Sequence, residues 1–387
     1  MKICLKSSDH LEKHLHIICL DVPYPVNYGG VCDLFYKLPE LQKQQVKIHL
    51  HCFDKDRGEQ PELNKYCEEV FYYPRKTGHK GLSPHLPYIV TSRYDENLLN
   101  RLLADDHPIL MEGVHTTYLV SDDRFSNRRK FVRIHNVEHK YYRQLFSYSK
   151  NLKQKLYYLF EANRLFNYEK KLAVSAAQLW SVTTKDMDYY RTEFACKNIG
   201  YLPIFIPSSW SDIPQEGMGG YCLYHGNLEI AENEHAVAWL VKHVFSKLKI
   251  PLLIAGKNPS KKMNHLIEGY QHVNLVSNPG EAEMQDMICK AHIHVLPSFS
   301  HTGIKIKLLN ALFNGRHCVV NTAMTEGTSL SSTCHVINSA DEFKERISLL
   351  YHQPFTAEEK NFRKEILQRE FSNETNARQI IKWIWAD

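Results

Sequence analysis

The strongest constraint on the fold is a regular exchange between short apolar segments and amphipathic segments. An apolar run at 15–21 leads through a Pro- and Gly-rich loop at 22–30 into a stretch with helical spacing at 31–45, and residues 46–53 then alternate like a strand. Strands that alternate with helices form mainly parallel sheets with right-handed crossovers. The first part of the chain therefore predicts a doubly wound α/β domain.

The same exchange continues and then starts again after a break. Further strands are predicted at 109–111, 131–134 and 179–182, with a long basic helix at 151–176. Periodicity is then lost in a Gly- and Pro-rich stretch, and a second series follows, with strands at 221–224, 252–255, 273–276, 293–296 and 318–321 and helices at 234–247, 281–290 and 304–314. We predict an α/β protein with two Rossmann-like domains at 1–205 and 221–354, a linker at 206–220, and helices at 355–387 that can pack back on the first domain.

Composition agrees with two globular domains. With 387 residues, 43% of them hydrophobic and 24% charged, the chain can bury roughly three quarters of its unfolded surface, which excludes a disordered or fibrous protein. The 48 Lys and Arg residues exceed the 43 Asp and Glu residues by only five. A nucleic-acid partner is therefore not expected.

Cysteine usage and apolar runs bear on the cellular compartment. The ten cysteines include no C-x-x-C pair and several lie in apolar runs, as expected for reduced thiols in a cytosolic protein. Charges interrupt the first 14 residues, and no apolar run approaches the roughly 18 residues of a membrane span. We predict a cytoplasmic protein, with peripheral contact at the inner membrane face as an open alternative.

Gly29 and Gly30 lie between the first predicted strand and helix. Backbone N–H groups and the helix dipole favour an anion at such a place, so the pair could bind a phosphate. The competing interpretation is a tight turn that requires positive φ, and the residues alone do not separate the two.

Polar residues follow the predicted strand 131–134. Active sites in doubly wound folds lie at the carboxyl ends of strands, which makes Arg133, His135, Asn136 and Glu138 candidate site residues. The segment also reads H-x-x-E-H from His135 to His139, a zinc-peptidase pattern. That chemistry needs both histidines on one helix, whereas the first is predicted at the end of a strand, so the zinc interpretation is disfavoured.

A second candidate segment follows the predicted strand 293–296. Here a helix is expected to begin near Gly303, so its free N–H groups and a lysine, Lys305 or Lys307, could bind a diphosphate. Lys307 and Asn310 are three residues apart and share a helix face. In isolation, the segment equally fits an amphipathic helix with solvated lysines.

Two histidine pairs and one basic helix also need an interpretation. His49 and His51, like His292 and His294, are two residues apart on predicted strands, but no acidic or Cys ligand accompanies them at recognisable spacing, so structural roles are favoured over metal binding. The basic helix fits either a solvated face or a surface for a membrane-held anionic acceptor; its cations are Lys153, Lys155, Arg164, Lys170 and Lys171.

Taken together, these segments resemble a family 4 glycosyltransferase of the GT-B fold. The resemblance is carried by the Gly29–Gly30 loop and by segments 133–139, 161–169, 224–228 and 303–320, in that order, and it spans about residues 15–340. It implies a retaining transfer of a sugar from a nucleotide-sugar donor, without a bound metal or other cofactor, in a cleft between two Rossmann-like domains. The expected acceptor is a growing surface glycan or a lipid-linked precursor.

The resemblance also assigns roles to individual residues. Gly29 and Gly30 would lie against the donor phosphates and sugar, His135 would contact the transferring sugar, and Lys305 or Lys307 would neutralise the leaving diphosphate. Further donor contacts would come from Gly303 and from Gly226 and Asn227, which open the second half. Acceptor contacts would come from the first domain, at Arg133, Asn136 and Glu138.

The sequence departs from the family pattern at two places. Where the family usually has two glutamates eight residues apart, this chain has Thr302 and Asn310, and neutral side chains cannot make the charge-assisted hydrogen bonds of a carboxylate. A usual Arg and Lys pair is not evident at 227–234. We therefore keep two alternatives to a glycosyltransferase: a catalytically degenerate binder of nucleotide-sugar or glycan, and a GT-B nucleotide-sugar epimerase.

Overall fold

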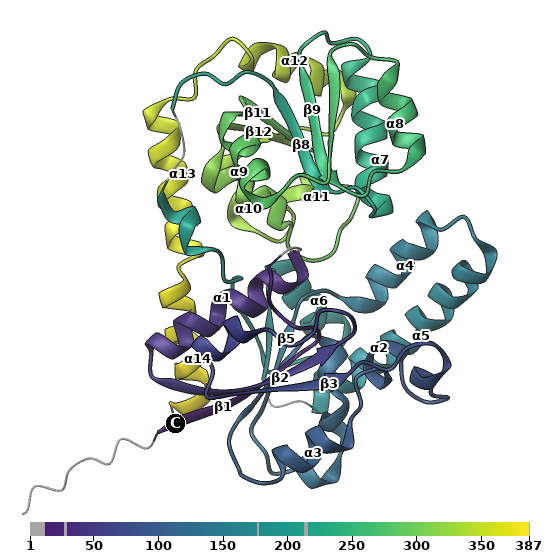
Figure 1. Cartoon of the computed structure of the whole chain (residues 1–387), viewed down its shortest axis with the longest axis vertical. Helices are drawn as coiled ribbons and strands as arrows, with labels where there is room; N and C mark the ends of the chain where they lie inside the picture. Colours follow the sequence, from purple (N-terminus) through teal and green to yellow (C-terminus); the bar gives the residue numbers. More distant parts are fainter. Residues whose placement is uncertain (1–11, 27–28, 176–177, 213–215, 387) are drawn as a thin grey trace, which may run out of the picture.

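The computed structural model describes residues 12–26, 29–175, 178–212 and 216–386, and it contains two parallel sheets, one above the other in Figure 1. The first has the strand order β3-β2-β1-β4-β5-β6-β7 and the second β10-β9-β8-β11-β12-β13. Every strand pair is parallel; for example, Lys13 of β1 pairs with Val46 of β2. The predicted fold class, two Rossmann-like α/β domains, is confirmed.

The first sheet consists of β1 (Lys13–Cys19), β2 (Val46–Asp54), β3 (Glu69–Pro74), β4 (Ile109–Glu112), β5 (Lys130–Ile134), β6 (Gln178–Ser181) and β7 (Ile199–Tyr201). The second consists of β8 (Cys222–Asn227), β9 (Leu252–Lys257), β10 (Val273–Ser277), β11 (Ile293–Leu296), β12 (His317–Val320) and β13 (His335–Val336). Central strands such as β4 and β11 are buried at every position, as expected for sheets covered by helices on both faces.

The helices of the first domain are α1 (Gly29–Lys43), α2 (Tyr88–Thr91), α3 (Glu96–Leu102), α4 (Glu138–Tyr148), α5 (Leu152–Ser175) and α6 (Thr184–Glu193). Those that follow are α7 (Ala231–Trp239), α8 (Lys261–Glu268), α9 (Glu281–Lys290), α10 (Ile306–Asn314), α11 (Thr322–Thr325), α12 (Ala340–Leu350), α13 (Ala357–Glu370) and α14 (Asn373–Trp385). No helix among the described residues is long and apolar enough to cross a membrane.

The last two helices return the chain to the first domain. Helix α13 contacts α10 of the second domain, whereas α14 packs against α1 and places Ile380 and Ile384 in the core of the first (Figure 1). The Trp383 ring stacks on Trp180 of β6 with centroids 5.3 Å apart. The chain therefore crosses between the domains twice, once between β7 and β8 and once between α13 and α14.

Some local predictions differ from the structure. Helix α4 follows β5 almost at once, where only a polar segment was expected, and it forms a hairpin with α5 that projects beside the domains (Figure 1). The edge strands β3, β7 and β13 were also missed. Strand β13 has only two residues and β7 three, too few for a periodic pattern to emerge.

Candidate active site between the domains

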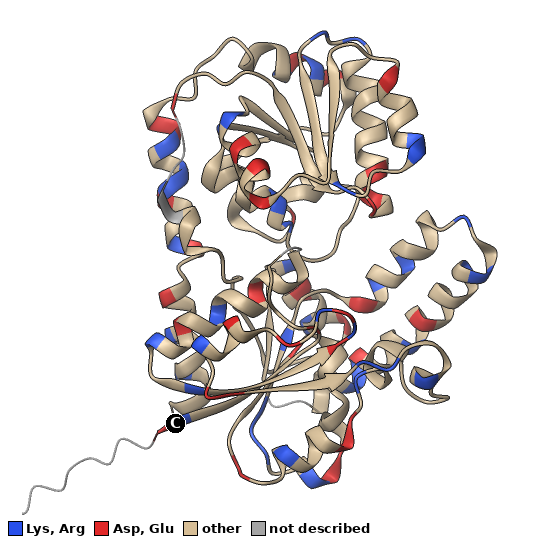
Figure 2. Ribbon diagram, viewed as in Figure 1, with Lys and Arg blue, Asp and Glu red and all other residues tan. Residues whose placement is uncertain are grey.

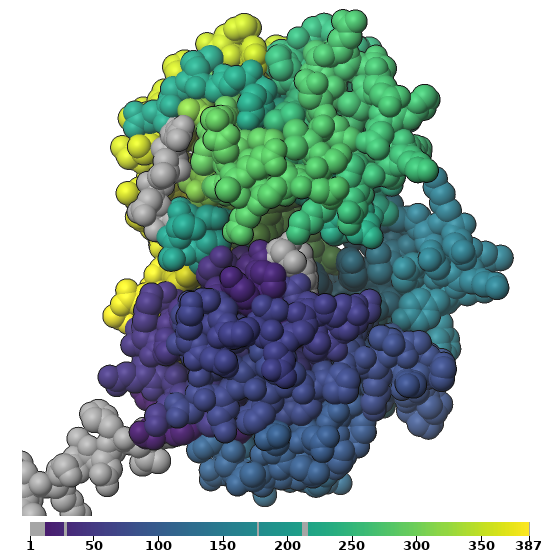
Figure 3. All heavy atoms as spheres, viewed as in Figure 1, coloured from purple at the N-terminus to yellow at the C-terminus, as the bar shows by residue number. Residues whose placement is uncertain are grey.

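The carboxyl ends of the two sheets face each other. Helix α1 follows β1 and α10 follows β11, and their amino termini meet: a Cβ placed on Gly29 would lie 3.3 Å from Cδ1 of Ile306. Figure 3 shows the purple and blue residues of the first domain directly below the green residues of the second. Because the first N–H groups of a helix have no partner within the helix, this meeting point favours an anion.

The predicted glycines take part in this meeting. Gly29 and Gly30 are the first two residues of α1 and both are exposed. Because Gly30 lies within a right-handed helix, the alternative of a tight turn with positive φ is wrong for it. Phosphate binding at this helix end stays a prediction.

Gly303 holds the loop before α10 against the loop after β5. Its φ is +62°, and a Cβ there would lie only 2.0 Å from Oδ1 of Asn136 and 3.1 Å from the carbonyl oxygen of His135. Its N–H donates to Oδ2 of Asp186 at 3.3 Å. Only glycine fits this conformation and this close approach, so the sequence itself brings His135 and the amino end of α10 together.

His135 is oriented by a buried carboxylate. Its Nε2 lies 2.9 Å from Oε2 of Glu112, the last residue of β4, and the imidazole is 16% exposed whereas Glu112 is fully buried. The other oxygen of Glu112 accepts from Nζ of Lys37. Burial by itself would raise the pKa of Glu112, but Lys37 and His135 outweigh burial and lower it. Glu112 therefore stays ionised and fixes the ring of His135.

A second buried carboxylate continues this network. Asp33 of α1 accepts two hydrogen bonds from the guanidinium of Arg133, at 3.0 and 3.2 Å, and one from N–H of Phe205 at 2.7 Å; its Oδ2 lies 3.4 Å from Nζ of Lys37. Despite burial, the charges of Arg133 and Lys37 hold the pKa of Asp33 below its usual value. The group Asp33, Lys37, Glu112 and Arg133 is called the charge network below.

The predicted acceptor role of Arg133 is wrong. Its side chain is completely buried, and its donors are taken by Asp33 and by the carbonyl oxygens of Leu202 and Pro203. Glu138 is also buried, 3% exposed, and is not open to an acceptor in this structure. Burial, together with the charge of Glu169, raises the pKa of Glu138 to about 8. Asn136, which is half-buried against Gly303, stays a predicted contact.

The H-x-x-E-H segment does not form the geometry of a zinc peptidase. His135 precedes α4, whereas His139 lies within it. Both nitrogens of His139 are engaged, Nδ1 with Glu169 at 2.7 Å and Nε2 with the Tyr189 hydroxyl at 3.0 Å. The two histidines therefore do not share a helix face.

On the second domain, Lys307 is buried among neutral groups. Its Nζ donates to the Tyr224 hydroxyl at 3.0 Å and to Oδ1 of Asn233 at 2.7 Å, and it lies 4.8 Å from the centroid of the Tyr224 ring. Burial lowers its pKa to about 8. A Cβ on Gly226 would lie 3.7 Å from Cδ of Lys307, so this glycine borders the lysine's stem.

Lys305 lies just before α10, and its Nζ donates to the carbonyl oxygen of Thr302. Burial lowers its pKa as well. Within the described part of the chain, no carboxylate lies within ion-pair distance of Lys305 or Lys307. The interpretation of both as solvated surface lysines is therefore wrong.

The remaining predicted donor contacts are neutral. Oδ1 of Asn310 accepts from Nδ2 of Asn314 at 2.8 Å, so this side chain bonds within its own helix. Thr302 is buried, with its hydroxyl 3.5 Å from that of Ser300. Asn227 ends β8, and its backbone oxygen accepts from Nδ2 of Asn233 at 2.8 Å.

Sequence reasoning missed the partners that hold the predicted residues in place: Asp33, Lys37, Glu112, Asp186, Tyr224 and Asn233. One signal was available, because Asp33 and Lys37 are four residues apart on the apolar face of a helix that also carries Val31, Leu34 and Leu38. Charges on such a face are rarely buried unless they are paired. The other partners come from distant elements and carry no local signal.

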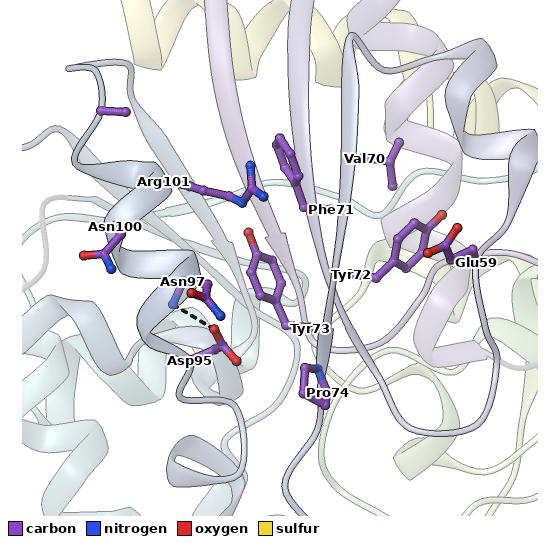
Figure 4. Close-up of a pocket in the computed structure, with 11 residues that line it drawn as sticks. Glu59, Val70, Phe71, Tyr72, Tyr73, Pro74, Asp95, Asn97, Asn100 and Arg101 are labelled. Atoms are coloured by element: carbon purple, nitrogen blue, oxygen red, sulfur yellow. Dashed lines mark hydrogen bonds between the residues drawn. The ribbon is translucent and has the colours of Figure 1, made fainter.

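A surface hollow lies elsewhere, on the edge strand β3 (Figure 4). It is lined by Phe71, Tyr73 and Arg101, whose guanidinium carbon lies 4.1 Å from the centroid of the Phe71 ring. Asp95 caps α3 beside it by accepting from N–H of Asn97 at 2.9 Å. None of the predicted site residues lines this hollow, so it belongs to a different part of the surface.

Direct contacts hold the two domains together around the site. Lys185 of α6 pairs with Glu326 at 2.7 Å, and N–H of Thr184 donates to the carbonyl oxygen of Gly327 at 3.0 Å. From α4, Oε1 of Gln144 accepts from the Ser300 hydroxyl at 2.9 Å. Helices α4 and α6 of the first domain therefore touch the loops that follow the strands of the second.

Comparisons with known proteins agree with this geometry. Residues 219–353 match the family Glycosyl transferases group 1. Sucrose-phosphate synthase from Thermosynechococcus elongatus superposes with a TM-score of 0.69 at 13% identity, covering 96% of this chain and 98% of that one. TarM superposes with a TM-score of 0.69 at 12% identity, covering 97% and 99%. The chain has the GT-B fold, and its second domain has the sequence pattern of a group 1 glycosyltransferase.

One curated relative is similar over most of the chain. An uncharacterized 44.6 kDa protein in the cps region of Klebsiella pneumoniae is 25% identical over 346 residues, which cover 84% of this chain and 87% of that protein. Among the structures, TarM from S. aureus has also been solved in complex with UDP and a glycan ligand.

Proposed function

We propose that this chain is a retaining glycosyltransferase that moves a sugar from a nucleotide-sugar donor to a glycan or lipid-linked acceptor in surface polysaccharide synthesis. The observation that carries the proposal is the meeting of His135, the amino end of α1 and the Lys305–Lys307 segment at the carboxyl ends of both sheets. Ligands of doubly wound folds bind at such ends.

The second domain supplies the positive charge. When the glycosidic bond to the donor breaks, negative charge develops on the leaving diphosphate, and fixed donors nearby stabilise that transition state most. Helix ends at α1 and α10 offer free N–H groups, and Lys305 and Lys307 have no carboxylate partner within the described residues. An incoming diphosphate would be their counter-ion.

The first domain supplies a fixed imidazole. Because Glu112 is ionised and lies 2.9 Å from Nε2 of His135, it favours the tautomer with a proton on that nitrogen. The imidazole is thereby held in one orientation at the cleft, where it would contact the transferring sugar. Turnover should depend on this orientation more than on the charge of the ring.

We propose that the diphosphate is neutralised without a divalent cation. The lysines and helix ends already provide cationic groups, and the carboxylates nearest His135 are paired with protein cations: Glu112 with Lys37, and Asp33 with both Lys37 and Arg133. An added cation would have to displace these buried pairs.

The acceptor side points to a surface. In the hairpin α4–α5, the acidic residues Glu138, Glu161 and Glu169 are all buried, whereas the lysines and arginines are exposed or half-buried (Figure 2). Large apolar side chains are exposed on the same hairpin: Leu152, Leu156, Leu159 and Phe160. Cations beside apolar groups suit an anionic membrane face that carries a lipid-linked acceptor, and the cps-region relative suggests a capsule-type polysaccharide.

The direct test is a panel of UDP-, GDP-, CDP-, ADP- and dTDP-sugars, scored by thermal shift and by release of the nucleotide. We expect one nucleotide to raise Tm, because a ligand of the folded state alone stabilises it, and its sugar donor to be slowly hydrolysed. Lys307→Met should lose the shift, while Lys290→Met, an exposed lysine on α9, should keep it. No shift and no turnover with any donor would contradict the proposal.

A second function is favoured by one observation. Thr302 and Asn310 are neutral, and Asn310 bonds within its own helix, so the site may lack donor contacts needed for transfer. A degenerate binder would show the thermal shift but release no nucleotide under any condition. Restoring carboxylates with Thr302→Glu and Asn310→Glu should then create turnover.

A further inference from the structure

Five histidines gather on the first sheet, away from the cleft. They come from the amino end of β1 (His14 and His16), from β2 (His49 and His51), and from the loop before β4 (His107). The His14 ring stacks on His107 and on His49, with centroids 4.5 and 5.2 Å apart. Because the proposed active site is at the carboxyl ends of these strands, sugar transfer does not account for this cluster.

The inner part of the cluster is a balanced chain of hydrogen bonds. The Tyr73 hydroxyl lies 2.9 Å from Nδ1 of His51, Nε2 of His51 lies 2.9 Å from Nδ1 of His16, and Nε2 of His16 lies 3.0 Å from Asp105. With both imidazoles neutral, each donates one proton along the chain and accepts one, ending on the carboxylate. Burial lowers the pKa of His16 to about 4 and that of His51 well below its usual value, in agreement with neutral rings.

The outer part of the cluster does not balance in this way. Nε2 of His14 lies 3.4 Å from Glu12, and Nδ1 of His49 lies 2.8 Å from Glu69, so each neutral imidazole gives its one proton to a carboxylate. The nitrogens left over, Nδ1 of His14 and Nε2 of His49, then face each other at 2.9 Å with two lone pairs and no hydrogen between them. A cation placed between the two nitrogens would remove this conflict.

We propose that His14, His49 and His107 form a binding site for a divalent transition-metal ion of the zinc class. One nitrogen from each of the three lies within 4.8 Å of the others. Two nitrogens bound tetrahedrally to zinc at about 2.0–2.1 Å are themselves about 3.3 Å apart, close to the separation of His14 and His49. Glu12 and Glu69 accept from the second nitrogens, the usual support of ligating imidazoles.

The third ligand is suited to this role. Burial lowers the pKa of His107, which favours the neutral imidazole that binds metals. Three imidazoles are a nitrogen-rich set, which suits zinc, nickel or copper better than calcium or magnesium. The ion would join β1, β2 and the loop before β4, three segments that are distant in sequence.

Two other groups in the described chain meet the same distance criterion but fit a metal less well. Asp33, Glu112 and His135 are already paired with protein cations. In the group His317, His335 and Glu359, Nε2 of His317 lies 3.2 Å from the carbonyl oxygen of Gln353 and its Nδ1 lies 3.6 Å from Glu359. That group has two imidazoles, whereas the outer cluster has three.

The test uses the full chain without a histidine tag, stripped with chelator and titrated with Co²⁺ while the visible spectrum is recorded. We expect one equivalent to bind with the absorption of a tetrahedral nitrogen site, Zn²⁺ to displace it, and Zn²⁺ to raise Tm. His49→Gln and His107→Gln should each weaken binding about 100-fold or more, since they remove a ligand.

Matched controls separate this site from other histidines. His265→Gln, at an exposed position on α8, and His335→Gln, in the competing group, should leave the stoichiometry and the spectrum unchanged. Circular dichroism of the metal-free variants checks that they fold. The proposal is overturned if the wild-type chain binds no Co²⁺ or Zn²⁺ at micromolar concentration, or if His49→Gln and His107→Gln bind as the wild type does. Neither result depends on glycosyltransferase activity.

Discussion

The two domains present their strand ends to the same cleft with opposite electrostatic designs. On the first domain, the charge network contains two carboxylates and two cations, and every one of them is buried and paired. On the second domain, Lys305 and Lys307 are also buried, but their partners are carbonyl, hydroxyl and amide oxygens.

This difference divides the work of the site. A neutral, fully paired network needs no ligand and serves to hold His135 in place. Buried cations without counter-ions are costly, which the lowered pKa values of both lysines reflect, and an anion relieves that cost. We therefore expect changes on the first domain to affect folding and turnover, and changes on the second to affect donor binding.

The largest effect should come from breaking the charge network. Arg133→Met leaves Asp33 buried with only Lys37 nearby, and removal of one partner of a buried ion pair costs about 3–5 kcal/mol of the free energy of unfolding. Chemical denaturation measures it. The double variant Arg133→Met with Asp33→Leu should recover part of the loss, because no charge is then left unpaired. Equal stability of Arg133→Met and the wild type would show that the network is not structural.

Next in size is the loss of the imidazole. His135→Ala should lower the rate of sugar transfer about 10²–10³-fold, the range typical for loss of one preorganised group, with little change in Tm. Glu112→Gln should lower the rate less, because the ring remains but its orientation is no longer fixed by a charge. Rates at saturating donor measure both. A fully active His135→Ala variant would remove this residue from the mechanism.

Removal of a cation on the second domain should affect binding more than folding. Lys307→Met should weaken the nucleotide diphosphate about tenfold or more, since a charge-assisted contact is lost, while Tm should stay or rise because a buried charge has been removed. Calorimetric titration gives Kd. If Kd is unchanged, the neutralising role moves to Lys305.

The same lysine predicts a pH dependence. In the free protein the pKa of Lys307 is about 8, below the 10.5 of an exposed lysine. The protonated form binds the diphosphate, so affinity should be constant below pH 7 and should fall, by at most about tenfold per pH unit, as pH rises through 8. Lys307→Met should bind with a flatter profile. A wild-type profile that is flat from pH 6 to pH 9 would contradict this.

The smallest expected effect concerns the hairpin. Leu156→Asp together with Phe160→Asp removes two exposed apolar groups and adds negative charge, so binding to vesicles with anionic lipid should weaken several-fold. Turnover with a soluble acceptor should be unchanged. Flotation with anionic and with neutral vesicles measures binding, and binding that is equal in both lipids would contradict an electrostatic contact.

The sequence predicted the architecture well because the relevant signals are local. Alternating apolar and amphipathic segments identified both sheets, and the order of the segments around Gly29, His135 and Gly303 placed them at strand ends. Arg133 was assigned wrongly, because its burial depends on Asp33, one hundred positions away in the chain. The outer histidine cluster was missed for the same reason: His49 was noted, but His14 and His107 reach it only in the folded sheet.

The path of the chain has a mechanical consequence. The polypeptide crosses between the domains twice, between β7 and β8 and again between α13 and α14, and α14 is anchored on α1. A body attached at two points rotates most freely about the line through them, much as a door moves on two hinges. Opening of the cleft should therefore be a swing about this axis, while sliding or twisting of one domain over the other should be restricted.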